Sequence, residues 1–182
     1  MTKFNRLHKL PTETITENLR PMTEADVPAV TIALNKHLTE NYSVHIVFNQ
    51  DEIRHFFMPQ EQVVYSWIVS DDATGVVTDF ISHYALNSSV LNDPHHDKIY
   101  AAYAFYNFAK DNEAARMKLL MRDALILAKA NNFDVFNMTE VLKHKMVKED
   151  LMFKPGDGRL AHYLYNWRVR SIQSDDIGIV LV

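Results

Sequence analysis

The apolar residues of this chain follow two periods, one typical of helices and one typical of strands. Helical spacing appears first in a stripe formed by Val27, Val30, Leu34 and Leu38. Thr23, with Asp26 three residues later, is a variant of the capping box and predicts where this helix begins. Asn49 and Glu52 repeat the start signal before a second helix, which should end at Pro59. Its buried face is predicted to consist of Ile53, Phe56 and Phe57.

Strand patterning takes over in the middle of the chain. Residues 63–69 and 76–86 predict the two strands of a hairpin, joined by a turn that contains Gly75. Residues 99–109, which carry alternating aromatic side chains, predict a third strand. A long helix is predicted over 112–131, with an inward face formed by Met117, Leu120, Met121, Leu125 and Ala128.

The last third of the chain predicts shorter elements. Residues 133–136 predict a strand, and Thr139 is expected to cap a further helix. Two final strands, at 160–168 and 178–182, are expected to close the sheet. This order predicts a mixed α/β (α+β) fold in which helices cover the faces of a mixed, twisted sheet. Residues 1–18 are expected to form an extended lead-in segment, with a strand around 6–11, and 19–182 to form one domain.

The composition of the chain excludes several classes of partner and of functional site. A chain of 182 residues, with 47% hydrophobic and 23% charged residues, is typical of one globular domain. A formal net charge of -4, without a cluster of Lys and Arg, argues against a nucleic-acid partner. The absence of cysteine excludes disulfides, thiolate metal sites and a cysteine nucleophile. We see no apolar run long enough for an integral membrane segment and no signal peptide, so a cytoplasmic location is expected.

Two motifs favour ordinary structural roles. The run Asp93-Pro94-His95-His96-Asp97 has the residue types of a metal site, but adjacent histidines on a strand or turn point apart. We therefore predict a loop and no metal. The aromatic residues Tyr163, Tyr165 and Trp167 alternate along one predicted strand, which is typical of ordinary sheet packing.

The final six residues, 177–182, form an apolar run of strand type with an α-carboxylate at its end. A charge in an apolar environment is costly unless it is paired or hydrogen-bonded. One interpretation is a last strand whose carboxylate reaches solvent. The other is that the carboxylate lies in a site and acts there. The pattern alone leaves both interpretations open.

Longer strings of residues resemble one family. They include Asn18-Leu19-Arg20-Pro21-Met22, Thr78-Asp79-Phe80, Ala101 to Asn107, Asp123 to Lys129, Phe133 to Asn137, Gly156-Asp157-Gly158, Tyr163 to Arg168 and Ile177 to Val182. In this order, and over nearly the whole chain, they resemble the C-terminal half of eukaryotic glycylpeptide N-myristoyltransferase. The order of elements likewise looks like an N-acetyltransferase-type fold.

This resemblance implies an acyltransferase that moves myristate from myristoyl-CoA to the N-terminal glycine of proteins. It implies two acetyltransferase-like lobes, of which the N-terminal lobe binds most of the acyl-CoA and this chain binds the glycine peptide. The carboxylate of Val182 is then expected to be the catalytic base. The peptide-binding positions that it implies are Ser88, Tyr103, Asn137, Asp157, Gly158 and Leu160.

The residues themselves agree with this division. A CoA site needs free backbone N–H groups at a helix start, usually with glycine. The corresponding stretch here, 109–113, has no glycine and two acids, so we expect no cofactor to be bound by this half. Three departures from the family pattern occur, at Asn87, at the pair Lys154-Pro155 and at His83, where an aromatic residue is usual.

Two other functions stay open. The chain could be a non-catalytic peptide-binding module of acetyltransferase-like fold, or a structural remnant that only pairs with another subunit.

Overall fold

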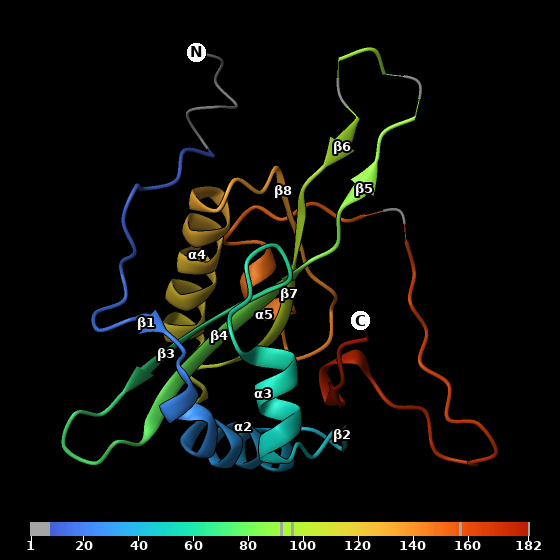
Figure 1. Ribbon diagram of the computed structural model, residues 1–182. Helices are drawn as coiled ribbons and strands as arrows, with labels where there is room; N and C mark the ends of the chain where they lie inside the picture. Colours follow the sequence, from blue (N-terminus) through green and yellow to red (C-terminus); the bar gives the residue numbers. More distant parts are fainter. Residues whose placement is uncertain (1–7, 92, 96, 157, 182) are drawn as a thin grey trace.

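The computed structural model describes residues 8–91, 93–95, 97–156 and 158–181 of the chain. A five-stranded sheet runs through its centre (Figure 1). In spatial order its strands are β1 (Arg20–Pro21), β3 (Val64–Ser70), β4 (Val77–Ala85), β7 (Ala101–Phe108) and β8 (Val135–Asn137). The first four pair in antiparallel fashion, whereas β8 joins β7 in parallel. The sheet is therefore mixed, as the sequence predicts.

Helices pack on both faces of this sheet, so that two apolar clusters form. One cluster contains residues of α2 (Val27–Asn41) and α3 (Gln50–Phe57) together with Phe80 and Phe105. The other contains residues of α4 (Ala114–Ala130) and α5 (Lys145–Lys148). The predicted stripe Val27, Val30, Leu34 and Leu38 is fully buried. Single turns of 3-10 helix are η1 (Glu24–Asp26), η2 (Lys110–Asn112) and η3 (Ser174–Asp176).

Two small sheets lie beside the central one. The strands β5 (Ser88–Ser89) and β6 (Lys98–Ile99) form a short antiparallel ladder. The strands β2 (Val44–His45) and β9 (Ile177–Gly178) pair in parallel, which joins the end of α2 to the end of the chain. The second of these sheets positions the C-terminal segment.

Both predicted helix starts are confirmed. Asn49 accepts the N–H of Glu52 at 2.9 Å, while the Glu52 carboxylate accepts the N–H of Asn49 at 2.7 Å. Thr23 is followed by η1, which leads directly into α2. In the second helix Ile53 and Phe57 are buried, but Phe56 is 36% exposed, contrary to prediction, because it lies on a neighbouring face of α3.

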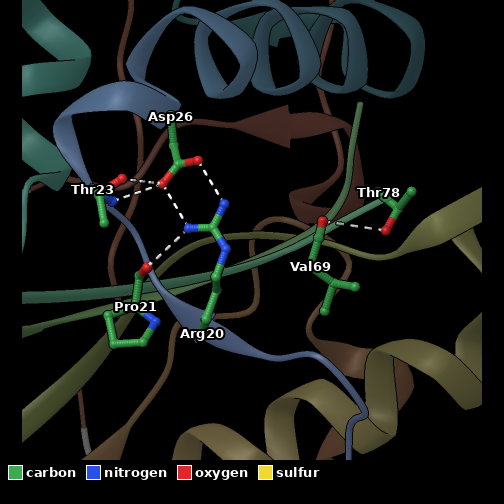
Figure 2. A network of polar contacts seen from close by, with 6 residues as sticks. All are labelled: Arg20, Pro21, Thr23, Asp26, Val69 and Thr78. Carbon is green, nitrogen blue, oxygen red and sulfur yellow. Dashed lines mark hydrogen bonds and ion pairs between the residues drawn. The ribbon is translucent and has the colours of Figure 1, made fainter. Parts of the chain in front are cut away.

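An ion pair fastens β1 to the start of α2 (Figure 2). The Arg20 guanidinium donates to both carboxylate oxygens of Asp26, at 2.8 and 2.7 Å. Asp26 also accepts the N–H and the hydroxyl of Thr23, at 2.8 and 2.7 Å. These hydrogen bonds hold the pKa of the Asp26 carboxyl well below its usual range, and the bond from Arg20 has the largest effect. Figure 2 also shows the Thr78 hydroxyl donating to the Val69 carbonyl, at 3.3 Å, between β4 and β3.

The predicted strand at 160–168 is wrong. No strand is assigned among the described residues of that segment, and a turn occurs there, with Asn166 at a left-handed φ of 61°. Its aromatic side chains do not pack in a sheet, since Tyr163, Tyr165 and Trp167 are 88%, 87% and 76% exposed. Aromatic residues do alternate along this segment, but it has no neighbouring strand within the described part of the chain.

Three other boundaries differ from the prediction. Among the described residues of the final run, only Ile177–Gly178 is a strand, and it pairs with β2 and not with the central sheet. Thr139 does not cap a helix, because Leu142 and Lys143 take left-handed φ values of 55° and 58° and α5 starts after them. The expected strand around 6–11 lies partly outside the described residues, and 8–11 are not a strand. The short β1 forms the sheet edge instead.

His83 is a polar residue in an aromatic environment. Its side chain is fully buried, and neither ring nitrogen has a hydrogen-bond partner among the described residues. Four aromatic rings surround it at 5.2–5.6 Å between centroids: Tyr65, Trp67, Phe133 and Phe136. Burial lowers the pKa of His83 to about 3, so the ring is neutral at physiological pH.

We predict that His83→Phe stabilises the fold. An unpaired buried polar group costs about 1–3 kcal/mol, and phenylalanine removes this cost while keeping a planar ring. In the unfolded chain the pKa of His83 returns to about 6.5, so the parent loses stability as the pH falls below that value. The advantage of the variant should therefore grow by about 2 kcal/mol between pH 7 and pH 5. Urea unfolding at both pH values measures it.

The matched control is His144→Phe, which also replaces a buried histidine. The His144 ring contacts the Thr139 carbonyl at 3.0 Å and the Asn107 amide at 3.1 Å, so its loss should destabilise the protein. Destabilisation by both variants would contradict our account of His83.

Candidate functional site

The C-terminal segment lies against the sheet and is held there by two tyrosines. The N–H of Val180, which is buried, donates to the Tyr106 hydroxyl at 3.2 Å. The Tyr84 hydroxyl donates to the Leu181 carbonyl at 3.4 Å. Burial raises the pKa of both tyrosines, so both hydroxyls stay protonated. Val182 lies outside the described residues, but these contacts fix the two residues that precede it.

Tyr106 reaches this segment because of a β-bulge. The ladder between β4 and β7 shifts register between Ile81 and His83, so that Phe105 and Tyr106 together oppose Ser82. Ser82 donates its hydroxyl to the Tyr106 carbonyl at 2.8 Å and accepts the Tyr106 N–H at 3.0 Å. A bulge re-aims side chains, and here Phe105 and Tyr106 belong to the same apolar cluster.

A row of polar side chains crosses the sheet next to this segment. Tyr84 on β4 pairs with Tyr103 on β7, and their rings stack at 5.5 Å between centroids. Tyr103 pairs in turn with Asn137 on β8. Because paired residues of neighbouring strands project from the same face, these three side chains form one row. The structure thus brings together Tyr103 and Asn137, two of the positions that the family resemblance implies for peptide binding.

The other predicted positions lie elsewhere. Ser88 is exposed on β5, where it pairs with Ile99. Gly158 is exposed, and Leu160 is 59% exposed, within the segment that precedes the turn at Asn166. Asp157, like Val182, lies outside the described residues. Among the described positions of this set, only Tyr103 and Asn137 are therefore brought side by side.

The β2–β9 pair fits closely against α2. A Cβ atom built on Gly178 would lie 2.9 Å from two ring atoms of Tyr42, which is closer than real Cβ contacts. Tyr42 is buried and lies beside His37, whose pKa burial lowers to about 4. Gly178 therefore lets the final run approach α2.

The loop before α4 offers no ready anion cradle. The N–H groups of Lys110, Asn112 and Glu113 already donate to protein acceptors, one of them the Asp79 carboxylate at 3.1 Å. Asp79 is buried and also accepts two bonds from Arg116, at 2.9 and 3.1 Å. The Lys110 N–H and the Arg116 guanidinium thus bind a protein carboxylate, and Arg116 neutralises its charge.

The loop at 93–97 contains an ordinary turn. The Asp93 carboxylate accepts the N–H of His95 at 2.7 Å. His96 lies outside the described residues, among which no group of three potential metal ligands occurs.

Comparison with known proteins places this chain in a family. The profile described as "Myristoyl-CoA:protein N-myristoyltransferase, C-terminal domain" matches residues 1–180. The chain belongs to this family.

Individual relatives agree. The chain is 41% identical, over 97% of its length, to glycylpeptide N-tetradecanoyltransferase 2 of Danio rerio, of which it covers 35%. It is 39% identical, over its whole length, to glycylpeptide N-tetradecanoyltransferase 1 of Arabidopsis thaliana, of which it covers 41%. The chain thus spans about two fifths of these relatives, which are acyltransferases.

Solved structures confirm the fold. The N-myristoyltransferase of Saccharomyces cerevisiae with bound myristoyl-CoA superposes with a TM-score of 0.77, at 29% identity, over 85% of this chain and 39% of that one. Glucosamine-6-phosphate N-acetyltransferase of Arabidopsis thaliana superposes with a TM-score of 0.58 at 12% identity, over 80% of this chain and 96% of that one. The acetyltransferase-like fold predicted from the sequence is therefore confirmed.

The sequence did not indicate the roles of Ser82, Tyr84 and Tyr106. In hindsight one signal was present. Phe105 and Tyr106 are adjacent aromatic residues in a strand that otherwise alternates, and such a break in the period is what a bulge produces. Nothing in the pattern showed that the bulge would face the C-terminal segment of an N-myristoyltransferase domain.

We predict that Ser82→Ala weakens the bulge. The variant leaves the N–H and carbonyl of Tyr106 without their buried partner, which should cost about 1–3 kcal/mol in the free energy of unfolding. Denaturant titration measures it. Ser66, on β3, is the matched control. It pairs with Ser82 on β4, and its buried hydroxyl has no hydrogen-bond partner among the described residues. Ser66→Ala should be neutral or stabilising, and an equal loss in both variants would contradict the role of Ser82.

We predict that Gly178→Ala displaces β9. The added methyl group meets the Tyr42 ring near its base, where the ring cannot swing away cheaply, and such overpacking costs about 1–3 kcal/mol. Thermal unfolding and amide exchange at Gly178 to Val180 report the change. The control is Gly156→Ala, where a Cβ meets nothing within 4 Å. If the two variants have the same unfolding temperature, the close contact between Gly178 and Tyr42 does not contribute to stability.

Proposed function

We propose that this chain is the peptide-binding half of an N-myristoyltransferase, which transfers myristate from myristoyl-CoA to the N-terminal glycine of proteins. The observation that carries this proposal is the position of the C-terminal segment. Two tyrosines hold Val180 and Leu181 beside the row of Tyr84, Tyr103 and Asn137. A peptide bound along this row would bring its first residue close to the end of the chain.

In the complete enzyme we assign the general base to the α-carboxylate of Val182. The glycine amine is mostly an ammonium ion at neutral pH and must lose a proton before it attacks the thioester carbonyl. The carboxylate would take this proton as the new amide bond forms and CoA leaves as the thiol. Val180 is buried, and this apolar surrounding favours a neutral pair over a carboxylate and an ammonium ion.

A second lobe, which binds the acyl-CoA, is the partner that this proposal requires. The segment that contains Leu160, Tyr163, Tyr165 and Trp167 supports it, because exposed apolar surface of this kind marks an interface. The relatives, which are more than twice as long, have room for such a lobe. Ser88, Asp157, Gly158 and Leu160 would then complete the peptide groove.

The second candidate is a non-catalytic module that binds N-terminal peptide segments. The loop before α4 favours it, because the N–H groups of Lys110, Asn112 and Glu113 already donate to protein acceptors. Calorimetry with a glycine peptide and with myristoyl-CoA separates the two. Peptide binding by the chain, together with acyl transfer once a second lobe is supplied, supports the enzyme. Peptide binding without transfer in that complex supports the module.

Cellular location follows from composition alone. We propose the cytoplasm, as the cysteine-free sequence favours a reducing compartment. Among the described residues, no helix is both long and apolar enough to cross a membrane.

We predict that the chain alone does not transfer myristate at an enzymatic rate. Acyl transfer depends on an oxyanion hole, whose loss typically costs about 10²–10³ in rate, and in our proposal the other lobe supplies it. The measurement is product formation from myristoyl-CoA and a glycine peptide. Turnover by the chain alone would contradict the division between two lobes.

We predict that one glycine added after Val182 abolishes transfer by the complete enzyme. The addition moves the carboxylate by about 3.5 Å, which removes it from the amine, while peptide binding should survive in part. Val182→Leu is the control, since it changes the side chain and keeps the carboxylate in place. Full activity of the extended enzyme would show that the terminus only completes the fold.

A further inference from the structure

A trough lies outside the proposed peptide site, between α4, β8 and the segment after α5. Its volume is about 650 Å³, and residues 8–10 also border it. Its apolar lining includes Leu125, Phe133, Phe136, Leu151 and Phe153. The rings of Phe136 and Phe153 lie 6.2 Å apart between centroids. We call this feature the α4 trough.

The charges around the α4 trough are unbalanced. Its two acids are engaged: Asp150 pairs with Lys118 at 2.7 Å, and Asp134 accepts the N–H of Tyr100 at 2.9 Å. Three further cations line it, Lys9, Arg122 and Lys129, and none of them forms an ion pair with a described residue. Asp134 keeps its negative charge, because the N–H that it accepts is neutral, so four cations and two carboxylates leave a net charge of +2 around the trough. An excess of positive charge beside an apolar lining favours a ligand that is both apolar and acidic.

One border of the α4 trough is an open sheet edge. Within the described residues β8 is the last strand of the central sheet, and it contributes Val135 and Phe136 to the trough. The N–H of Val135 points toward the carbonyl of Tyr100, next to β7, at 3.4 Å. Since backbone groups alternate along a strand, the N–H and carbonyl of Phe136 face the open side. An unpaired edge of this kind accepts a further strand.

We propose that the α4 trough binds an extended acidic peptide segment of a partner protein, which adds to β8 as an edge strand. Its backbone pairs with Phe136, its apolar side chains enter the trough, and its carboxylates contact Lys9, Arg122 and Lys129. This site is separate from the row of Tyr84, Tyr103 and Asn137, which projects from the sheet face opposite α4. The proposal does not depend on acyl transfer.

The probe is a fluorescent seven-residue peptide with alternating Glu and Val, titrated against the 182-residue chain. Binding should be saturable and should fail for the matched peptide with Lys in place of Glu. The double variant Arg122→Glu with Lys129→Glu should weaken binding at least tenfold. The control is Lys36→Glu, an exposed residue of α2 away from the trough, which should have little effect. If Lys36→Glu weakens peptide binding as much as the double variant does, the proposal is overturned.

Strand addition has its own test. Two peptides are compared. One is N-methylated at the amides of its odd-numbered residues, and the other at the amides of its even-numbered residues. One peptide should lose binding because its methylated amides face β8, and the other should keep it because its methylated amides face solvent. Equal binding of both peptides would overturn strand addition. If anionic phospholipid vesicles bind with the same dependence on Arg122 and Lys129 and the peptide does not bind, the site is a lipid site and the proposal is wrong.

Discussion

The β-bulge opposite Ser82 is the constraint on which the proposed site depends. Without the extra residue in β7, Phe105 and Tyr106 would point to opposite faces of the sheet. With it, Tyr106 joins the cluster on the α2 face, and its hydroxyl meets the N–H of Val180 at 3.2 Å. The Ser82 hydroxyl donates to the Tyr106 carbonyl and accepts the Tyr106 N–H, which satisfies the backbone groups that the bulge removes from the ladder.

The C-terminal segment is then held from several sides. Pairing with β2 fixes Ile177 and Gly178, close contact with Tyr42 fixes their distance from α2, and Tyr84 holds Leu181. Each restraint comes from a different part of the chain. Together they make the position of Val180 and Leu181 a property of the whole fold, as the proposed site requires.

Local signals in the sequence were enough for the elements whose cause is local. The capping residues Asn49 and Glu52 located a helix start, and strand alternation located β3, β4 and β7. The resemblance to the family indicated Tyr103 and Asn137, which the fold places side by side. Where the cause was not local, prediction failed. The alternating Tyr163, Tyr165 and Trp167 suggested a strand, but a strand needs a neighbour, and the described residues do not supply one. Left-handed backbone at Leu142 and Lys143 was equally invisible in the pattern.

The hydrogen bond between Tyr106 and Val180 allows the most direct test of our central claim, that the fold positions the chain end for catalysis. Tyr106→Phe keeps the ring and removes only the hydroxyl that the Val180 N–H needs. In the complete enzyme, single-turnover kinetics should show a transfer rate about 5- to 150-fold lower, since losing this bond costs about 1–3 kcal/mol. The affinity for the glycine peptide should stay close to that of the parent. An unchanged transfer rate, or a loss confined to peptide affinity, would contradict the claim.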